Sequence, residues 1–372
     1  MSSNGFAAFL SLYRRGAVKG RIKRTSGGWF DCSKRASCLE NGEVSAYRAG
    51  ACSVSAWRTR CSTVNSSALR LARDGEYSTL SFTGASMRAL VTGGAGFIGS
   101  TLVDALVARG DEVTILDNLS TGRADYLNPD ARFIQADLIH DDLDTAFVDI
   151  ELVFHTAALA RVPRSIEDPV GTHEANVTAT LRVLKAAADA GSRRVIYSSS
   201  SSVYGDQPTL PLTEPMAPNP LNPYACQKLM GELYARNFAR VFGLHTTSLR
   251  YFNVYGPRQA ESGAYRLVIG IFLEQRRCGE RLTIHGDGLQ TRDFTHVSDV
   301  VRANLLASSA GELPPGEVIN VGAGREVSIR DVAALVGGPV EHLPPRGHDE
   351  RFKRADIAKA RALLGWEPRV SF

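Results

Sequence analysis

A tyrosine and a lysine four residues apart are the first candidates for chemistry in this chain. Tyr224 and Lys228 lie in "NPYACQKLMGELYARNF", where Pro223 suits the first turn of a helix. A spacing of four places both side chains on one helical face. Because a nearby ammonium favours the ionised phenol, we expect a lowered pKa for Tyr224, which would then serve as a general base toward a hydroxyl group. Taken alone, the pair equally fits a solvated helix face.

A glycine-rich turn gives that pair a context. "LVTGGAGFIGS" spaces Gly93, Gly96 and Gly99 between a predicted strand over 88–92 and a helix that opens near Phe97. Glycines let the backbone approach a pyrophosphate closely, and the first turn of the helix offers free N–H groups. The pattern therefore predicts a dinucleotide site.

Two aspartates refine the choice of dinucleotide. Asp117 ends the next predicted strand, "EVTILDN", 18 residues beyond Gly99. A carboxylate there accepts hydrogen bonds from the adenosine ribose hydroxyls and repels a 2′-phosphate, so the sequence favours NAD over NADP. Asp137, at the end of the third predicted strand, is placed to meet the adenine.

Five consecutive serines follow another strand-like stretch in "RVIYSSSSSVYGD", from Ser198 to Ser202. Serine runs are typical of flexible linkers, but this one follows an apolar segment rich in β-branched residues. If that segment is a strand of a parallel sheet, the serines lie at its carboxyl end, where α/β proteins place ligands.

The elements that must position these residues alternate between strand and helix from Met87 onward. "RFIQADL", "ELVFHTAAL", "RRVIYSS" and "HTTSLRYFNVYG" read as strands, and "NVTATLRVLKAAADAGS" reads as a helix that ends near Gly191. Such alternation predicts an α/β fold, a Rossmann-type doubly wound parallel sheet covered by helices on both faces.

Residues 1–86 have a different character. They carry 13 Lys and Arg against 5 Asp and Glu, whereas the remaining residues carry 30 against 34, so the net charge of +4 gives no argument for a nucleic-acid-binding core. Three interpretations stay open for this region: upstream sequence read from a wrong start, a disordered tail, or a transit peptide. No apolar run is long enough for a transmembrane helix, so we expect no membrane partner.

The cysteines argue against a metal site. Four of the six lie in the first 86 residues, no C-x-x-C pair occurs, and no spacing suits zinc. The two that remain, Cys226 and Cys278, fit free thiols in a reducing compartment, and we expect a cytoplasmic protein.

The motifs together resemble the extended short-chain dehydrogenase/reductase superfamily, and within it the nucleotide-sugar epimerases typified by UDP-glucose 4-epimerase. The segments that carry the resemblance are "TGGAGFIGS", "LDNLSTG", "ADL", "FHTAAL", "SVYGD", "YACQK", "LRYFNVYGPRQ", "RDFTHVSDV" and "KARALLGWEP". The resemblance implies a Rossmann-type NAD-binding domain over 87–253 and about 297–325, and a smaller nucleotide-sugar-binding domain over 254–296 and 326–372. It also implies a homodimer.

The resemblance also implies roles for individual residues. Ser200, 24 residues ahead of Tyr224, occupies the slot of the catalytic serine, Tyr224 is the base, and Lys228 is its partner and binds the nicotinamide ribose. The cofactor residues that it implies are Gly93, Gly96, Phe97, Ile98, Gly99, Asp117, Asn118, Asp137, Leu138, Thr156, Ala157, Ala158, Asn176 and Phe252. The residues that it implies for the substrate are Ser200, Ser201, Asn253, Arg292 and Arg346.

The serine run favours one reaction among those of the superfamily. Related dehydratases place an Asp-Glu pair in this loop and related decarboxylases place a Glu, whereas only serines lie between Tyr197 and Val203 here. We therefore expect NAD-dependent epimerisation of a UDP-hexose at C4 through a 4-keto sugar, on UDP-glucose and UDP-galactose or their N-acetyl forms. The alternatives are a UDP-glucuronate epimerase, another nucleotide-sugar oxidoreductase or dehydratase, and a non-catalytic NAD-binding module.

Some positions depart from the family pattern. Arg161 stands where a small residue is usual near the sugar, and "RGHD" departs from the usual order around Arg346. Lys353 stands where a small residue would leave room for an N-acetyl group, so its side chain either closes that space or turns to solvent. The final helix of the family pattern has no counterpart after "GWEPRVSF", and we expect exposed apolar surface in its place.

Overall fold

The computed structural model describes residues 86–259, 267–345 and 350–372, together with two short strands, β1 (Ile22–Lys23) and β2 (Trp29–Phe30). By its contacts the chain divides into two compact units, one of which contains β1 and β2 while the other contains every element from β3 onward. In the first of these units β1 pairs antiparallel with β2.

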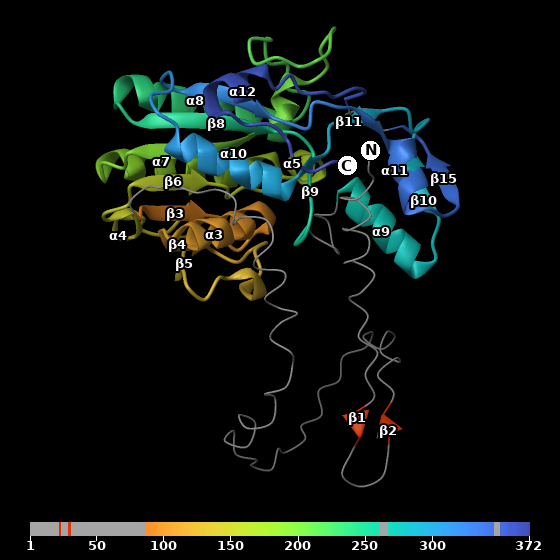
Figure 1. Ribbon diagram of the computed structural model, residues 1–372, viewed down its shortest axis with the longest axis horizontal. Helices are drawn as coiled ribbons and strands as arrows, with labels where there is room; N and C mark the ends of the chain where they lie inside the picture. Colours follow the sequence, from red (N-terminus) through yellow and green to blue (C-terminus); the bar gives the residue numbers. More distant parts are fainter. Residues whose placement is uncertain (1–21, 24–28, 31–85, 260–266, 346–349) are drawn as a thin grey trace. The chain divides into compact units, whose positions relative to one another are not determined.

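The larger unit is built on a seven-stranded sheet in the order β13-β8-β7-β6-β3-β4-β5 (Figure 1). Every neighbouring pair is parallel, which confirms the predicted Rossmann-type sheet. Its strands are β3 (Arg88–Thr92), β4 (Glu112–Asp117), β5 (Arg132–Gln135), β6 (Leu152–His155), β7 (Arg194–Ser200), β8 (His245–Tyr251) and β13 (Glu317–Val321). Because both faces of this sheet are covered, the inner strands are buried along most of their length: β3, β4 and β6 mainly with apolar residues, and β7 and β8 with buried polar residues as well.

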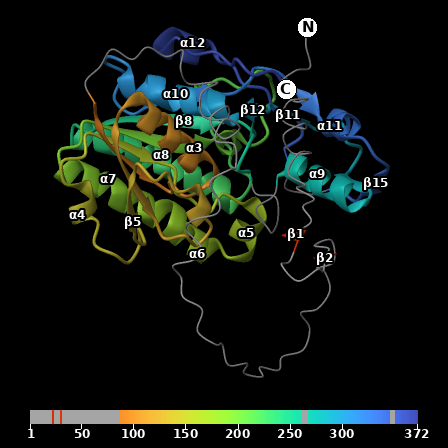
Figure 2. The same ribbon diagram turned by 60° about the horizontal axis from the view of Figure 1, so that its bottom comes forward.

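Helices cover the sheet in two layers (Figures 1 and 2). One layer contains α3 packed on α10, and the other contains α7 packed on α8. The helices of the sheet are α3 (Phe97–Arg109), α4 (Asp144–Phe147), α5 (Val162–Glu167), α6 (Pro169–His173), α7 (Ala179–Asp189), α8 (Pro223–Val241) and α10 (Val297–Ser309). Helix α3 begins at Phe97, as predicted, and ends at Arg109, where the C-cap residue Gly110 closes the last turn with a left-handed φ of 94°.

A smaller group of elements comes from chain segments on both sides of α10 and β13. Parallel strands β10 (Leu282–His285) and β15 (Val340–Leu343) pack against α9 (Val268–Cys278) and α11 (Ile329–Val336), and Figure 1 shows these four together. The remaining short elements are β9 (Val254–Tyr255), β11 (Thr291–Arg292), β12 (Thr295–His296), β14 (Val327–Ser328) and α12 (Ala358–Leu364), with 3-10 turns η2 (Ala124–Tyr126) and η4 (Ser201–Tyr204) and a π turn η3 (Glu174–Thr178). The division into a cofactor domain and a substrate domain stays a prediction.

In the part of the chain that the structure describes, no helix is both long enough and apolar enough to cross a membrane.

Candidate active site

The glycine-rich turn joins β3 to α3 with almost no space for side chains. A Cβ on Gly93 would lie 2.7 Å from the backbone of Ala157, and one on Gly99 would lie 2.1 Å from the Gly93 carbonyl oxygen. Gly93 also has a left-handed φ of 70°, which favours glycine. The N-cap residue Gly96 offers no side chain to the first turn of α3, so backbone N–H groups there are available to an anionic ligand.

Asp117 ties this turn to the end of β4. Its Oδ2 accepts a hydrogen bond from the Ala95 N–H at 3.0 Å, and its Oδ1 accepts one from the Leu119 N–H at 2.8 Å. The carboxylate is buried at the carboxyl edge of the sheet, beside the turn that carries the glycines. These hydrogen bonds hold the glycine-rich turn in place, and the position of the carboxylate is the one expected for a ribose contact.

The adenine candidates lie at the end of β5. Asn118 donates to the Asp137 carboxylate at 2.8 Å, and the Ile139 N–H donates to its other oxygen at 2.8 Å. Burial raises the pKa of Asp137, but these hydrogen bonds outweigh it and lower the pKa overall. The side chain of Leu138 belongs to the hydrophobic core, so only its backbone is available to a ligand.

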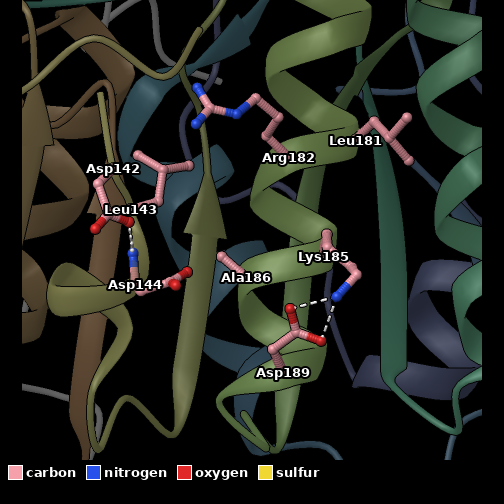
Figure 3. Close-up of a pocket in the computed structure, with 8 residues that line it drawn as sticks. All are labelled: Asp142, Leu143, Asp144, Leu181, Arg182, Lys185, Ala186 and Asp189. Atoms are coloured by element: carbon pink, nitrogen blue, oxygen red, sulfur yellow. Dashed lines mark hydrogen bonds and ion pairs between the residues drawn. The ribbon is translucent and has the colours of Figure 1, made fainter. Parts of the chain in front are cut away.

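A separate pocket of about 260 Å³ lies between α7 and the segment before α4 (Figure 3). Its basic residues are already engaged: Lys185 pairs with Asp189 at 2.5 Å, and Arg182 donates to the carbonyls of Leu138 and Asp141 at 2.6 and 2.7 Å. Arg182 thus connects α7 to the segment from Leu138 to Asp141, next to the adenine candidate Asp137.

The loop after β6 carries the next group of cofactor candidates. The Thr156 hydroxyl donates to the Thr92 carbonyl at 2.7 Å, and the chain leaves the sheet there, so β6 is shorter than predicted. Asn176, in η3, holds the far end of the loop, because its amide oxygen accepts from the Leu159 N–H at 2.7 Å and its amide nitrogen donates to Gln227 at 2.8 Å. Asn176 thus positions the loop that contains Ala157 and Ala158.

His155 is a residue that the sequence analysis missed. Its ring is buried between Thr92, 2.7 Å from Nδ1, and Thr180, 2.8 Å from Nε2, and it stacks on Tyr197. The Thr180 hydroxyl donates to the Asn176 carbonyl, so it accepts a hydrogen bond from the Nε2–H of His155. Burial, and then Lys228, lower the pKa of His155 to about 3, so the ring is neutral. The signal in the sequence was a polar residue inside an apolar strand.

The predicted catalytic helix begins where the sequence places it. Asn222 caps α8 by accepting from the Ala225 N–H, and Pro223 is its first residue. Lys228 is buried one turn after Tyr224, donates to the Ser198 carbonyl at 2.8 Å, and lies over the ring of Tyr197 at 5.1 Å. A Cβ on Gly231 would lie 2.1 Å from the Tyr197 hydroxyl oxygen, so the glycine in the next turn makes room for this ring.

The predicted lowering of the tyrosine pKa is wrong for the chain by itself. Burial raises the pKa of Tyr224 to about 12, and a hydrogen bond with Ser200 offsets only part of this. Burial also lowers the pKa of Lys228 to about 8, against the opposing effect of Glu232. The lysine points its ammonium at the strand carbonyl, so the phenol gains less from it than the spacing suggested.

The five serines take different partners. Ser198 contacts the Tyr251 hydroxyl at 3.1 Å, and Ser199 donates to Glu232 at 2.5 Å. Ser200 bonds with Tyr224 and accepts from the Ser202 hydroxyl at 2.8 Å. The run is therefore the end of β7 and the start of η4, and the serine predicted to be catalytic is the one beside the tyrosine.

The remaining candidates lie on segments that follow β8 and β10: Phe252 is the cofactor candidate, and Asn253 and Arg292 are the substrate candidates. Phe252 is buried beside Tyr204, with ring centroids 6.4 Å apart. The Asn253 carbonyl accepts from the Thr295 N–H at 2.9 Å. Arg292 uses its Nη1 to donate to the carbonyls of Thr291 and Glu350, each at 2.8 Å.

One predicted position cannot be placed, and another is resolved. Arg346 lies outside the described residues. Lys353 does not turn to solvent: its side chain is buried, and its Nζ lies 3.5 Å from the Ser201 hydroxyl oxygen. The ammonium thus closes the space next to the serine run.

The chain is similar to known proteins both in its sequence and in its fold. The model of the "NAD dependent epimerase/dehydratase family" matches residues 89–322. The chain is 42% identical to a UDP-glucose 4-epimerase of Mycolicibacterium smegmatis over 299 residues, which cover 77% of this chain and 95% of that protein. Two solved structures each cover 77% of this chain and 94% of their own, with TM-scores of 0.73. They are a UDP-glucose 4-epimerase of Thermotoga maritima with UDP-glucose, 40% identical, and a UDP-N-acetylglucosamine 4-epimerase of Methanobrevibacter ruminantium with UDP-N-acetylmuramic acid, 38% identical.

Proposed function

Because this chain belongs to the NAD-dependent epimerase/dehydratase family, we propose that it is an isomerase that interconverts the C4 epimers of a UDP-hexose, with NAD as its cofactor. The observation that carries this function is made at the carboxyl end of β7. There Ser200 hydrogen-bonds Tyr224, and residues 198–202 are all serines, so this stretch supplies no carboxylate. Two buried carboxylates nearby are already paired, Glu232 on α8 with Arg250 and Glu350 with Lys353. Elimination of water from a sugar needs a positioned acid and base. Epimerisation at C4 needs NAD for the hydride and, for the proton, only Tyr224 with the Ser200 hydroxyl.

The residues at this edge divide the proton transfer between them. Tyr224 takes the proton of the sugar C4 hydroxyl, and the Ser200 hydroxyl relays this proton. That hydroxyl hydrogen-bonds both Tyr224 and Ser202. Lys228 fixes the helix to β7 through the Ser198 carbonyl and keeps a positive charge near the phenol. NAD, when bound, supplies the hydride acceptor and donor at C4 and is regenerated in each cycle.

The chain offers a fitting cradle for NAD. The close approaches at Gly93 and Gly99 and the open first turn of α3 suit the pyrophosphate, and Asp117 suits the adenosine ribose. We assign the cofactor contacts to the predicted residues around them, with two qualifications from the structure. Leu138 contributes its backbone, and Asn176 acts through the loop that it holds.

The carboxylate of Asp117 provides a test of the cofactor assignment. In Asp117→Asn we expect NAD affinity to fall about 10-fold or more, because charged hydrogen bonds are worth about 1.5–3 kcal/mol, and discrimination against NADP to decrease. Titration of both dinucleotides measures the effect. The control is Glu341→Gln, which changes an exposed carboxylate on β15 and should leave both affinities unchanged. Equal NAD affinity in the two variants would contradict the role of Asp117.

For the substrate we assign the diphosphate to Arg292 and Arg346, and further contacts to Asn253, Ser200 and Ser201. The buried Lys353 supports UDP-glucose and UDP-galactose over their N-acetyl forms, because it occupies the space beside Ser201 that a larger substituent would need.

We also propose a cytoplasmic homodimer. Neighbouring helices α5, α6 and α8 leave large apolar side chains exposed on one part of the larger unit, namely Ile166, Val170, Leu233 and Tyr234. A second copy that covered this surface would remove it from water. The two cysteines in the described residues are free, which suits a reducing compartment.

The function is tested with the full-length protein and a panel of UDP-sugars. We expect interconversion of UDP-glucose and UDP-galactose without net consumption of added NADH, measured by chromatography of the nucleotide sugars. Stoichiometric loss of NADH would indicate a reductase. NAD binding without turnover of any UDP-sugar, including UDP-glucuronate, would favour the non-catalytic module and overturn the proposal.

A further inference from the structure

A buried ion pair lies beside the reactive serines. Lys353 is 4% exposed, and its Nζ lies 3.0 Å from Glu350 Oε1 and 3.5 Å from Ser201 Oγ. Lysine side chains usually carry their charge to solvent, so an ammonium held this far inside marks a specific local need. Among the described residues the contacts of this ammonium are the ion pair with Glu350 and the hydrogen bond with Ser201.

The pair is rigidly attached to the rest of the site. The Ala355 N–H donates to Asp293 at 3.0 Å, and the Leu212 N–H donates to the Arg354 carbonyl at 2.7 Å. At the other end of the segment Arg292 donates to the Glu350 carbonyl, so both ends of 350–355 are fixed by hydrogen bonds. Ser201, which the ammonium reaches, directly follows Ser200 in the chain. The Lys353 ammonium thus lies close to where the sugar reacts, and its N–H groups can donate to a ligand there.

Charged groups of both signs lie around the pair. Burial is the largest effect and lowers the pKa of Lys353, as Arg292 does, while Glu350 and Asp206 oppose them. Burial raises the pKa of Glu350, but Lys353 and then Arg292 outweigh it, so this carboxylate stays ionised. Because Arg292 is assigned to the diphosphate, the charge left beside the sugar is that of Glu350 and Lys353. Their opposite charges sum to zero, and Lys353 supplies the hydrogen-bond donor.

We infer that the Glu350–Lys353 pair selects substrates by the charge of the sugar, with Lys353 donating to a hydroxyl of a neutral hexose and Glu350 disfavouring a hexuronate. This inference rests on the proposed C4 epimerisation. A sugar hydroxyl can accept a hydrogen bond from the Lys353 ammonium without bringing another charge into the site. A sugar carboxylate beside Lys353 would also lie near the Glu350 carboxylate, which would repel it. The pair therefore assigns this site to UDP-hexoses without an acidic group.

Two single variants with opposite charge changes test the inference. Glu350→Gln keeps the size of the side chain and removes the negative charge, so the ratio of kcat/KM for UDP-glucuronate to that for UDP-glucose should rise about 10-fold or more. Lys353→Met keeps the length and leaves Glu350 uncompensated, so the same ratio should fall, and the KM for UDP-glucose should rise. NAD content and the thermal unfolding midpoint show that each variant is folded.

The outcomes separate this inference from the proposed function. A ratio that stays within twofold of the wild-type value in folded Glu350→Gln, or that rises in folded Lys353→Met, would overturn the inference while leaving epimerisation intact. A wild-type protein that prefers UDP-glucuronate would overturn it as well. Absence of all turnover by the wild-type protein would instead refute the proposed function. Because the variants make opposite predictions, either one alone decides the question if the other does not fold.

Discussion

Tyr224→Phe is expected to lower the rate of UDP-hexose interconversion by about 10³-fold while NAD remains bound. General acid–base catalysis contributes about 10²–10⁴-fold, and the substitution removes only the oxygen that exchanges the proton with the sugar. The helix should be unaffected, because the Tyr224 backbone N–H, which donates to Ser165, is retained. Turnover is measured with UDP-galactose, and bound NAD by its absorbance after release from the protein.

The pH dependence gives this prediction a direction. In the chain alone burial raises the pKa of Tyr224 to about 12, so the phenol is protonated, and inactive as a base, at neutral pH. Below that pKa the active phenolate increases as the pH rises, so kcat should increase with pH. The positive nicotinamide ring of bound NAD would shift this rise to lower pH.

Variants of the neighbouring residues sharpen the assignment. Lys228→Met, which removes the nearby positive charge, should move the rise of kcat to higher pH, because the phenolate loses its support. Normal turnover by Tyr224→Phe would refute the role of Tyr224 as the base. If Ser200→Ala lost no activity, the relay through that hydroxyl would be refuted.

The second large effect concerns stability. Glu232→Ala is expected to lower the free energy of unfolding by roughly 3–5 kcal/mol, because it leaves a buried guanidinium without its partner. Arg250 is 3% and Glu232 2% exposed, and two parallel hydrogen bonds of 2.8 Å join them. Ser199 would also lose its acceptor on Glu232. Urea unfolding followed by circular dichroism measures the change.

Two controls distinguish this mechanism from general damage to a helix. Lys185→Ala breaks an exposed pair, 59% and 56% exposed, and should cost no more than about 1 kcal/mol. A double variant that replaces both Glu232 and Arg250 by methionine should recover much of the loss, because no charge stays buried without a partner. A loss in Glu232→Ala no larger than in Lys185→Ala would show that the buried pair is not a main support of this fold.

The sequence was sufficient for features that depend on neighbours along the chain. The alternation of strand-like and helix-like segments predicted the parallel α/β sheet, and Pro223 marked the start of α8. The spacing of Tyr224 and Lys228 placed them one helical turn apart. The glycine motif predicted a turn between a strand and a helix, and the structure has this turn between β3 and α3. These predictions succeeded because local backbone geometry follows from local sequence.

Burial and distant contacts could not be inferred in this way. Five identical serines gave no basis in composition for their different partners, since Tyr251, Glu232 and Tyr224 come from other elements. The pKa of Tyr224 was predicted in the wrong direction, because the spacing revealed the lysine but not the burial that dominates.

Lys353 shows the same limit. In the sequence its side chain had two possible directions, and only the folded chain brings its ammonium to Ser201, 152 residues away, with Glu350 as its countercharge. The sequence by itself thus determined which chemical groups are present and in which local elements they lie. The tertiary structure decided their partners and their burial, because desolvation and ion pairing depend on residues that are distant in the chain.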